Sequence, residues 1–319
     1  VSGSVGISLY PGDGVEAETL MRNADTAMYH AKDSGRGKLQ FFTQHMNVAA
    51  QQRLTLENAL RRALEKREFE LHYQPLFDLR DRTVTGFEAL LRWKGPDGEL
   101  VPPAQFIAAA EDSGLIVPIG EWVLREALSQ AKRWQGAARP VMLSVNVSAN
   151  QLSRPTFVQR LRELVREAAI DPGLLELEVT EGVIIEGAGE AREALDQVAA
   201  LGIGIAIDDF GTGYSGLAYL KRLPIDTVKI DQSFVRDITI DPDDAAIVTA
   251  IVAMAASLGV DVVAEGVETP AQLEALRRLE CHRAQGFLLS PPLTAEAAAR
   301  LVGDAPVTQH PSRGEEQLA

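Results

Sequence analysis

The chain has 319 residues, of which 46% are hydrophobic and 24% are charged, and its formal net charge is −14. This composition excludes a disordered protein and allows one large domain or two smaller ones with buried cores. The excess of carboxylates argues against broad binding of nucleic-acid polymers, whose phosphates need Lys and Arg. No apolar run approaches the roughly 20 residues that span a bilayer, and the single cysteine, Cys281, fits a reducing cytoplasm.

Residues 1–43 predict a strand at 4–10, a helix at 18–32 and a second strand at 39–42. About 40 residues bury too little surface to form a domain, so we expect a docked remnant of a larger one. Because the sequence starts at Val1 inside a strand-like pattern, we expect a piece of a longer protein. We expect this fragment to lie in the cytoplasm and to make no membrane contact of its own. A membrane anchor in the missing upstream region is compatible with this expectation.

The following stretch, residues 44–67, is predicted to join this remnant to the rest of the chain. Its first part is polar and is predicted as a connector at 43–52. A helix is predicted at 53–67, because Leu56 and Leu60 begin an apolar repeat on one helix face.

From residue 68 onward, strand-like and helical patterns alternate. Strands are predicted at 69–79, 84–93, 141–147, 174–180, 203–207, 227–230, 260–264 and 284–288. Helices are predicted at 103–111, 119–135, 156–169, 190–201, 215–223, 243–258, 269–279 and 295–302. This α/β alternation over about 240 residues predicts a (β/α)8 barrel of the TIM type. Only residues 80–83 join the first two strands, and such a short turn requires an antiparallel first strand.

Two adjacent carboxylates, Asp208 and Asp209, end the apolar run at 203–207 and precede Gly211 and Gly213. Neighbouring carboxylates repel each other unless a positive charge lies beside them, and a divalent cation prefers such oxygen ligands. In TIM barrels, chemistry lies at the carboxyl ends of the strands. The polar residues predicted at or near those ends are Glu88, Asn146, Glu178, Glu181, Lys229, Glu265 and Gln285. This set favours Mg²⁺ or Mn²⁺, and the lack of a His or Cys cluster argues against zinc.

Some of these residues have a simpler interpretation. Taken singly, Glu181 or Asp231 is more readily interpreted as a helix cap or a solvated strand end. Glu176 and Glu178 share one strand face, so we expect one of them to be less buried, and the strand end favours Glu178 as the functional one. Residues 211–216 match the dinucleotide-binding pattern G-x-G-x-x-G. The two carboxylates directly before it would repel a pyrophosphate, so we interpret the segment as a flexible loop beside the metal site.

Several motifs occur in one order along the chain: Tyr73-Gln-Pro75, Glu88-Ala-Leu-Leu-Arg-Trp93, Asn146-Val-Ser148, Glu178-Val-Thr-Glu181, Asp208-Asp-Phe-Gly-Thr-Gly-Tyr-Ser215, Lys229-Ile-Asp231, Ala264-Glu-Gly-Val-Glu268 and Gln285-Gly-Phe287. With them, residues 68–303 resemble the EAL family of cyclic di-GMP phosphodiesterases. Residues 23–38 resemble the closing segment of a GGDEF (diguanylate cyclase) domain, whose signature lies upstream and is absent here. The resemblance divides the chain into a GGDEF remnant at 1–43, a connector and helix at 44–67, the EAL barrel at 68–303 and a disordered tail at 304–319.

The resemblance also implies roles for individual residues. It implies metal ligands at Glu88, Asn146, Glu178, Asp208, Asp209 and Glu265, with Glu265, Lys229 and Glu88 as catalytic residues. It implies substrate contacts at Gln74, Leu91, Arg92, Asp209 and Gln285, and a loop held in shape by Glu181, Gly211 and Gly213. The sequence departs from the family at Gly216, where a second Ser is usual, and at Pro291, where a basic residue is common.

The function that the resemblance implies is hydrolysis of cyclic di-GMP to linear 5'-pGpG with two Mg²⁺ or Mn²⁺ ions, which lowers this second messenger in bacterial signalling. A homodimer through the barrel is expected with it. The alternative is a catalytically silent receptor that binds cyclic di-GMP without cutting it. Without the resemblance, the residues indicate a Mg²⁺-dependent barrel enzyme that uses Lys229 as a base on a carbon acid.

Overall fold

The computed structural model describes residues 3–33, 37–95, 98–136, 141–186, 189–213 and 223–302. The chain divides into two compact units, one formed by residues 1–68 and 104–115 and the other by residues 69–103 and 116–319. The helix predicted at 215–223 lies almost entirely outside the described residues, as do Gly216 and the predicted tail at 304–319.

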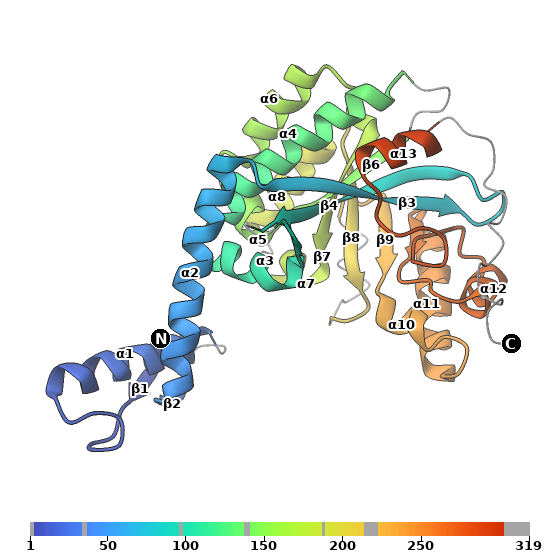
Figure 1. Cartoon of the computed structure of the whole chain (residues 1–319). Coiled ribbons are helices and arrows are strands. Elements are labelled where there is room, and N and C mark those ends of the chain that lie inside the picture. The colour runs from blue at the N-terminus through green and yellow to red at the C-terminus, as the bar shows by residue number, and fades with distance from the viewer. Residues whose placement is uncertain are drawn as a thin grey trace, which may run out of the picture. The chain divides into compact units, whose positions relative to one another are not determined.

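The first unit begins with the predicted strand, helix and strand (Figure 1). Strands β1 (Val5–Ile7) and β2 (Leu39–Phe41) pair in parallel, and α1 (Ala17–Asp33) connects them. The helix approaches β1 so closely at Gly6 that a Cβ there would lie 2.0 Å from the carbonyl oxygen of Ala24. Only glycine permits this contact.

Helix α2 (Gln44–Lys66) begins nine residues before the predicted helix at 53–67, so the prediction of a connector at 43–52 was wrong. Thr43 is extended at the N-cap position, and Met46 in the first turn is buried with Ala27 and Phe42. Gln, Ala and Met favour helices although the segment is largely polar, and packing of Met46 fixes the first turn.

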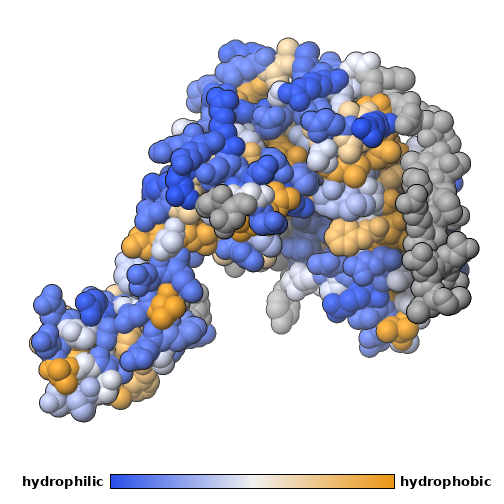
Figure 2. Space-filling view, viewed as in Figure 1, coloured by the Kyte–Doolittle hydropathy of each residue, from blue (hydrophilic) through white to orange (hydrophobic). Residues whose placement is uncertain are grey.

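The same unit holds most of α3 (Pro103–Asp112), where the Asp112 carboxylate forms an ion pair with Arg53 at 3.1 Å. Many large apolar side chains stay exposed on the N-terminal part of the chain, including Val5, Leu9, Tyr10, Met21 and Tyr29. Figure 2 shows hydrophobic surface on this part of the chain. So small a unit cannot cover all of its apolar surface.

The second unit is the predicted α/β barrel (Figure 1). Its strands are β3 (Phe69–Asp78), β4 (Val84–Lys94), β6 (Met142–Asn146), β7 (Leu175–Thr180), β8 (Gly204–Phe210), β9 (Thr227–Ile230), β10 (Asp261–Ala264) and β11 (Arg283–Ala284). They follow the order β3-β11-β10-β9-β8-β7-β6-β4, and a β3–β4 pairing closes the barrel. β3 is antiparallel to both β4 and β11, which confirms the expected antiparallel first strand. A short strand, β5 (Leu100–Val101), pairs with the end of β4.

Helices follow most of the strands. They are α4 (Ile116–Trp134), α5 (Ala149–Leu152), α6 (Phe157–Ala168), α7 (Glu181–Glu186), α8 (Glu190–Ala199), α10 (Gln232–Arg236), α11 (Pro242–Leu258), α12 (Pro270–Arg278) and α13 (Ala295–Leu301), with a 3₁₀ turn, η1 (Pro172–Leu174). In α6, Phe157, Leu161 and Leu164 form one buried face, as an amphipathic helix against a barrel requires. The short helices α5, α7 and α10 were not predicted, because few residues set their periodicity.

The last strand is shorter than the predicted strand at 284–288, because β11 ends at Ala284. Gly286 has φ +157°, and a Cβ on it would lie 2.2 Å from the backbone nitrogen of Val267. The chain therefore turns out of the ladder at Gly286, just after Gln285 has bonded through its backbone N–H to the carbonyl of Ala264 at 2.9 Å. Within the described part of the chain, no helix combines the length and the apolar character that a membrane span needs.

Candidate functional site

A polar pocket of about 200 Å³ lies in the barrel unit. Its lining includes four carboxylates, three glutamines and one aromatic ring: Glu88, Asp208, Glu265, Glu268, Gln74, Gln232, Gln285 and Phe287. Parallel strands bring their carboxyl ends to one edge of a barrel, which is why residues so far apart in sequence meet there.

The centre of the site is the ammonium group of Lys229, on β9, which is buried. Its Nζ contacts four carboxylates: Glu178 Oε2 at 2.7 Å, Glu265 Oε1 at 2.7 Å, Glu88 Oε2 at 3.2 Å and Asp208 Oδ1 at 3.4 Å. These residues come from β4, β7, β8 and the end of β10, so one cation links strands from all sides of the barrel mouth.

Two amides complete this network. Asn146 Nδ2 donates to Glu88 Oε1 at 2.7 Å, and Gln285 Nε2 donates to Glu88 Oε2 at 2.7 Å and to Glu265 Oε1 at 2.8 Å. Glu88 is therefore held by three side chains, and its orientation is fixed.

Burial and charge shift the proton affinities of these groups in different directions. Burial raises the pKa of Glu88, but Lys229 and the bonds from Gln285 and Asn146 outweigh it and hold this pKa below its usual value. Burial and the neighbouring Glu88 raise the pKa of Glu178 well above its usual value. Burial also raises the pKa of Glu265 to about 8, against the opposing charge of Lys229.

The pKa of Lys229 itself is raised. Burial lowers it, but the surrounding carboxylates, first Glu178 and then Glu265, outweigh burial and keep the ammonium protonated. The site thus combines a permanent cation with carboxyl groups of unequal proton affinity, which is common where proton transfer takes place.

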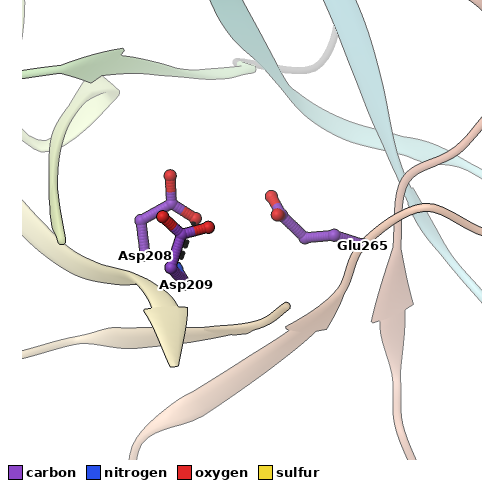
Figure 3. Close-up of side chains that lie close together, drawn as sticks. All are labelled: Asp208, Asp209 and Glu265. Carbon is purple, nitrogen blue, oxygen red and sulfur yellow. Dashed lines mark hydrogen bonds between the residues drawn. The ribbon is translucent and has the colours of Figure 1, made fainter. Parts of the chain in front are cut away.

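Asp208 and Asp209 point to the same mouth although they are neighbours in a strand (Figure 3). Successive side chains of a regular strand point to opposite faces. Here the pairing of β8 with β9 shifts register between Ile207 and Phe210, and Asp209 has φ +54°. This bulge turns Asp209 so that carboxylate oxygens of Asp208, Asp209 and Glu265 lie within 4.8 Å of one another.

These oxygens fit a divalent metal ion. They belong to a cluster of carboxylates, and hard divalent cations prefer such oxygen ligands. In addition, Glu178 Oε1 is buried and has no hydrogen-bond partner among the residues that the structure describes. A cation bound there would share the carboxylates of Asp208 and Glu265 with Lys229.

Glu181, at the start of α7, contacts the loop that follows β8. The backbone N–H of Gly211 donates to Glu181 Oε2 at 3.0 Å, and Gly211 has φ +99°. At Gly213 a Cβ would lie 2.5 Å from Glu181 Oε1. Glu181, Gly211 and Gly213 thus lie together as expected, while the rest of the loop, 214–222, lies outside the described residues.

Three of the predicted substrate contacts, Asp209, Leu91 and Arg92, are not among the residues that line the pocket. The Asp209 carboxylate nevertheless lies close to those of Asp208 and Glu265. Leu91 and Arg92 lie on β4, and Arg92 Nη1 donates to the carbonyl of Leu91 at 2.9 Å. Burial lowers the pKa of the Arg92 guanidinium. The substrate role of these two residues stays a prediction.

Sequence reasoning missed Phe287, Gln232 and Glu268, which also line the pocket. Phe287 was assigned to the strand predicted at 284–288, yet it lies beyond β11 and is 66% exposed. The sequence signal that could have identified Gln232 and Glu268 is that each follows a predicted strand. The expectation that one of Glu176 and Glu178 is less buried than the other was wrong, since both are 1% exposed.

The chain was compared with known proteins. The EAL domain family matches residues 57–292, and the diguanylate cyclase GGDEF domain family matches residues 1–38. Similar relatives include the bifunctional diguanylate cyclase/cyclic di-GMP phosphodiesterase MucR of Pseudomonas aeruginosa, 50% identical over 93% of this chain and 43% of MucR. The cyclic di-GMP phosphodiesterase PdeR of Escherichia coli is 42% identical over 93% of this chain and 45% of PdeR. The chain thus spans less than half the length of these curated relatives.

Among solved structures, the PaMucR phosphodiesterase in complex with c-di-GMP has a TM-score of 0.74 and 47% identity, over 76% of this chain and 99% of that one. The c-di-GMP-bound FimX EAL domain of Pseudomonas aeruginosa has a TM-score of 0.70 and 27% identity, over 75% of this chain and 96% of that one. The matched residues include every barrel strand and every carboxylate that contacts Lys229. The chain therefore belongs to the EAL domain family.

Proposed function

We propose that the barrel hydrolyses cyclic di-GMP to linear 5'-pGpG and so lowers this second messenger in bacterial signalling. The observation that carries the proposal is the cluster of four carboxylates around Lys229 beside an open pocket. The cyclic di-GMP phosphodiesterases among its relatives and the c-di-GMP complexes among its structural neighbours support this substrate.

The residues proposed to hold metal ions are those whose side chains supply oxygen donors at the site. Glu88, Asn146, Glu178 and Asp208 would hold one ion, while Asp209 and Glu265 would hold a second one that shares Asp208. Two bound Mg²⁺ or Mn²⁺ ions would supply Lewis-acid charge to the phosphodiester oxygens and activate water for attack.

The chain's own groups would handle the proton. Glu265 would accept it from the attacking water, because its carboxylate lines the pocket and is held in place there by Gln285. Lys229 lies 2.7 Å from Glu265 and adds positive charge beside the anionic phosphate. Gln285 orients Glu265 by donating to its Oε1 at 2.8 Å.

The pocket's aromatic ring is proposed to bind a guanine base. Phe287 exposes 66% of its surface and lines the pocket beside Gln285 and Gly286. Bases stack on exposed aromatic faces. Gln74, whose Nε2 donates to the carbonyl of Ser290 at 3.5 Å, also lines the pocket and would contact the ligand.

A homodimer through the barrel belongs to the same proposal. The exposed side of α11 supports it, because after Asp244 the helix carries no charged residue up to Leu258. Ile240 before the helix is 79% exposed, and Ile247 and Leu258 are also exposed. An apolar helix face of this kind is typical of an interaction surface.

The division of the chain remains a proposal as well: a GGDEF remnant at 1–43, a connecting segment at 44–67, the barrel at 68–303 and a tail at 304–319. The cytoplasmic location also stays a prediction.

The first test is turnover. Purified protein with cyclic di-GMP and Mg²⁺ should give pGpG, and EDTA should stop the reaction, as followed by chromatography and mass spectrometry. Glu88→Gln keeps the size of the side chain but removes a charged ligand, so turnover should fall about 100-fold or more, as for loss of one electrostatic stabiliser. Glu274→Gln on the surface of α12 is the matched control.

Two outcomes would contradict this. Tight binding of cyclic di-GMP without conversion, with Mn²⁺ also tried, would support the silent receptor instead. Unchanged turnover in Glu88→Gln would remove Glu88 from the set of metal ligands.

The second test concerns pH and stability in EDTA. The folded protein raises the pKa of Glu265 from 4.5 to about 8, so between these pH values it holds a proton that the unfolded chain has released. The contribution of Glu265 to the free energy of unfolding is fully present below pH 4.5 and is lost as the pH rises toward 8. Urea unfolding at pH 5, 6.5 and 8 should therefore show a falling free energy of unfolding, and Glu265→Gln should flatten the fall. Equal slopes in the two proteins would show that Glu265 does not cause it.

The third test concerns the base. Phe287→Ala should raise KM about tenfold with kcat nearly unchanged, because stacking contributes roughly 1–3 kcal/mol per base. Phe287→Trp keeps an aromatic face and should retain the KM of the unaltered protein. An unchanged KM in Phe287→Ala would exclude Phe287 from substrate binding.

The fourth test concerns assembly. Sedimentation should show a dimer, and Ile247→Glu should shift it toward monomer by placing a charge on the apolar side of α11. Arg278→Glu on α12 adds negative charge elsewhere and serves as the control. A monomer at all working concentrations of the unaltered protein would refute the dimer.

A further inference from the structure

A second polar cluster lies within the barrel unit, and the proposed mechanism does not use it. The Glu176 carboxylate, 1% exposed, accepts a hydrogen bond on each oxygen: from Ser144 Oγ at 2.9 Å on Oε2, and from Thr227 Oγ1 at 2.7 Å on Oε1. Ser144 and Thr227 are buried too, and none of the three is among the described residues that line the pocket.

The placement of these residues relates directly to the site. Ser144, Glu176 and Thr227 each lie two residues before a site residue on the same strand, and these partners are Asn146, Glu178 and Lys229. Residues two apart in a strand face the same side. The cluster therefore forms the layer directly beneath the residues that contact the ammonium and Glu88.

One of the two hydrogen bonds, from Thr227 to Glu176, connects strands that the sheet itself does not pair. Ser144 and Glu176 are register partners on β6 and β7, but β8 lies between β7 and β9. The register partner of Glu176 on β8 is Gly204, where a Cβ would lie 3.4 Å from Glu176 Cγ. The missing side chain at Gly204 leaves space for the Glu176 carboxylate to reach Thr227.

We propose that Glu176 is a positioning residue of this site: by joining β6, β7 and β9 from below, it fixes the spacing of Asn146, Glu178 and Lys229. The predicted effect on metal binding rests on the proposed function, whereas the predicted effect on the spacing of these residues does not depend on it. Groups that orient metal ligands typically change metal affinity or activity about 10- to 100-fold when they are removed.

The decisive pair of variants is Thr227→Val and Thr227→Ser. Valine keeps the shape of threonine but removes the hydroxyl, whereas serine keeps the hydroxyl and removes the methyl group. We expect Mn²⁺ affinity, measured by calorimetry, to fall about 10-fold in Thr227→Val and to stay within about threefold of the unaltered protein in Thr227→Ser. Glu176→Gln should also stay close to the unaltered protein, because its amide can accept from one hydroxyl and donate to the other.

A packing control distinguishes the proposed positioning role from a purely structural role. Leu195→Ala removes a buried side chain from α8, outside the cluster, and lowers stability through a cavity. It should lower the melting temperature and leave Mn²⁺ affinity unchanged. If Thr227→Val behaves like Leu195→Ala, with lower stability and normal Mn²⁺ affinity, the positioning role is wrong. If Glu176→Gln loses as much affinity as Thr227→Val, charge rather than hydrogen bonding matters, and the proposal is also wrong.

A crystal structure of Thr227→Val in EDTA makes the test independent of the reaction. The distance between Lys229 Nζ and Glu178 Oε2, 2.7 Å in the unaltered chain, should lengthen visibly. An unchanged distance would overturn the inference even if the protein hydrolyses cyclic di-GMP. A protein that binds no Mn²⁺ but shows the lengthened distance would instead refute the proposed function and support the positioning role.

Discussion

The ammonium of Lys229 holds the mouth of this barrel together. It is buried among four carboxylates, which without it would repel each other in a low-dielectric interior. Removing one partner of a buried ion pair typically costs about 3–5 kcal/mol, because the remaining charge stays buried and unpaired. The same contacts that stabilise this arrangement also set the unequal proton affinities of Glu88, Glu178 and Glu265.

Small residues on β8 make a polar barrel interior possible. TIM-type barrels are usually filled with branched apolar side chains. Here Gly204 and Ala206 are the register partners of Glu176 and Glu178, so β8 contributes little volume where β7 contributes two carboxylates. The lower carboxylate bonds to hydroxyls and the upper one to Lys229. The barrel therefore has two polar layers, of which the upper one faces the pocket.

Backbone conformation shapes the mouth above these layers. Asp209 has φ +54°, a left-handed value that Asp tolerates better than most residues because its short side chain can bond locally. Gly266 has φ +67°, and a Cβ there would lie 2.5 Å from Cβ of Gln232, so the segment after β10 passes close to the start of α10. Local strain of this kind is kept only where surrounding structure fixes it, and here the strands on either side do so.

The sequence by itself determined the barrel, its antiparallel first strand and the set of polar residues at its mouth. Strand and helix periodicity, a connection too short for a crossover and polar residues at strand ends are all local signals. Prediction from the sequence was wrong about the connector at 43–52, the length of the strand at 284–288 and the relative burial of Glu176 and Glu178. At these places packing and backbone contacts outweighed the local pattern. Only the tertiary structure decided that Asp208 and Asp209 face the same way, since the bulge depends on how β8 pairs with β9. It also decided that one ammonium meets four carboxylates, because such distances arise only when strands far apart in sequence close into a barrel.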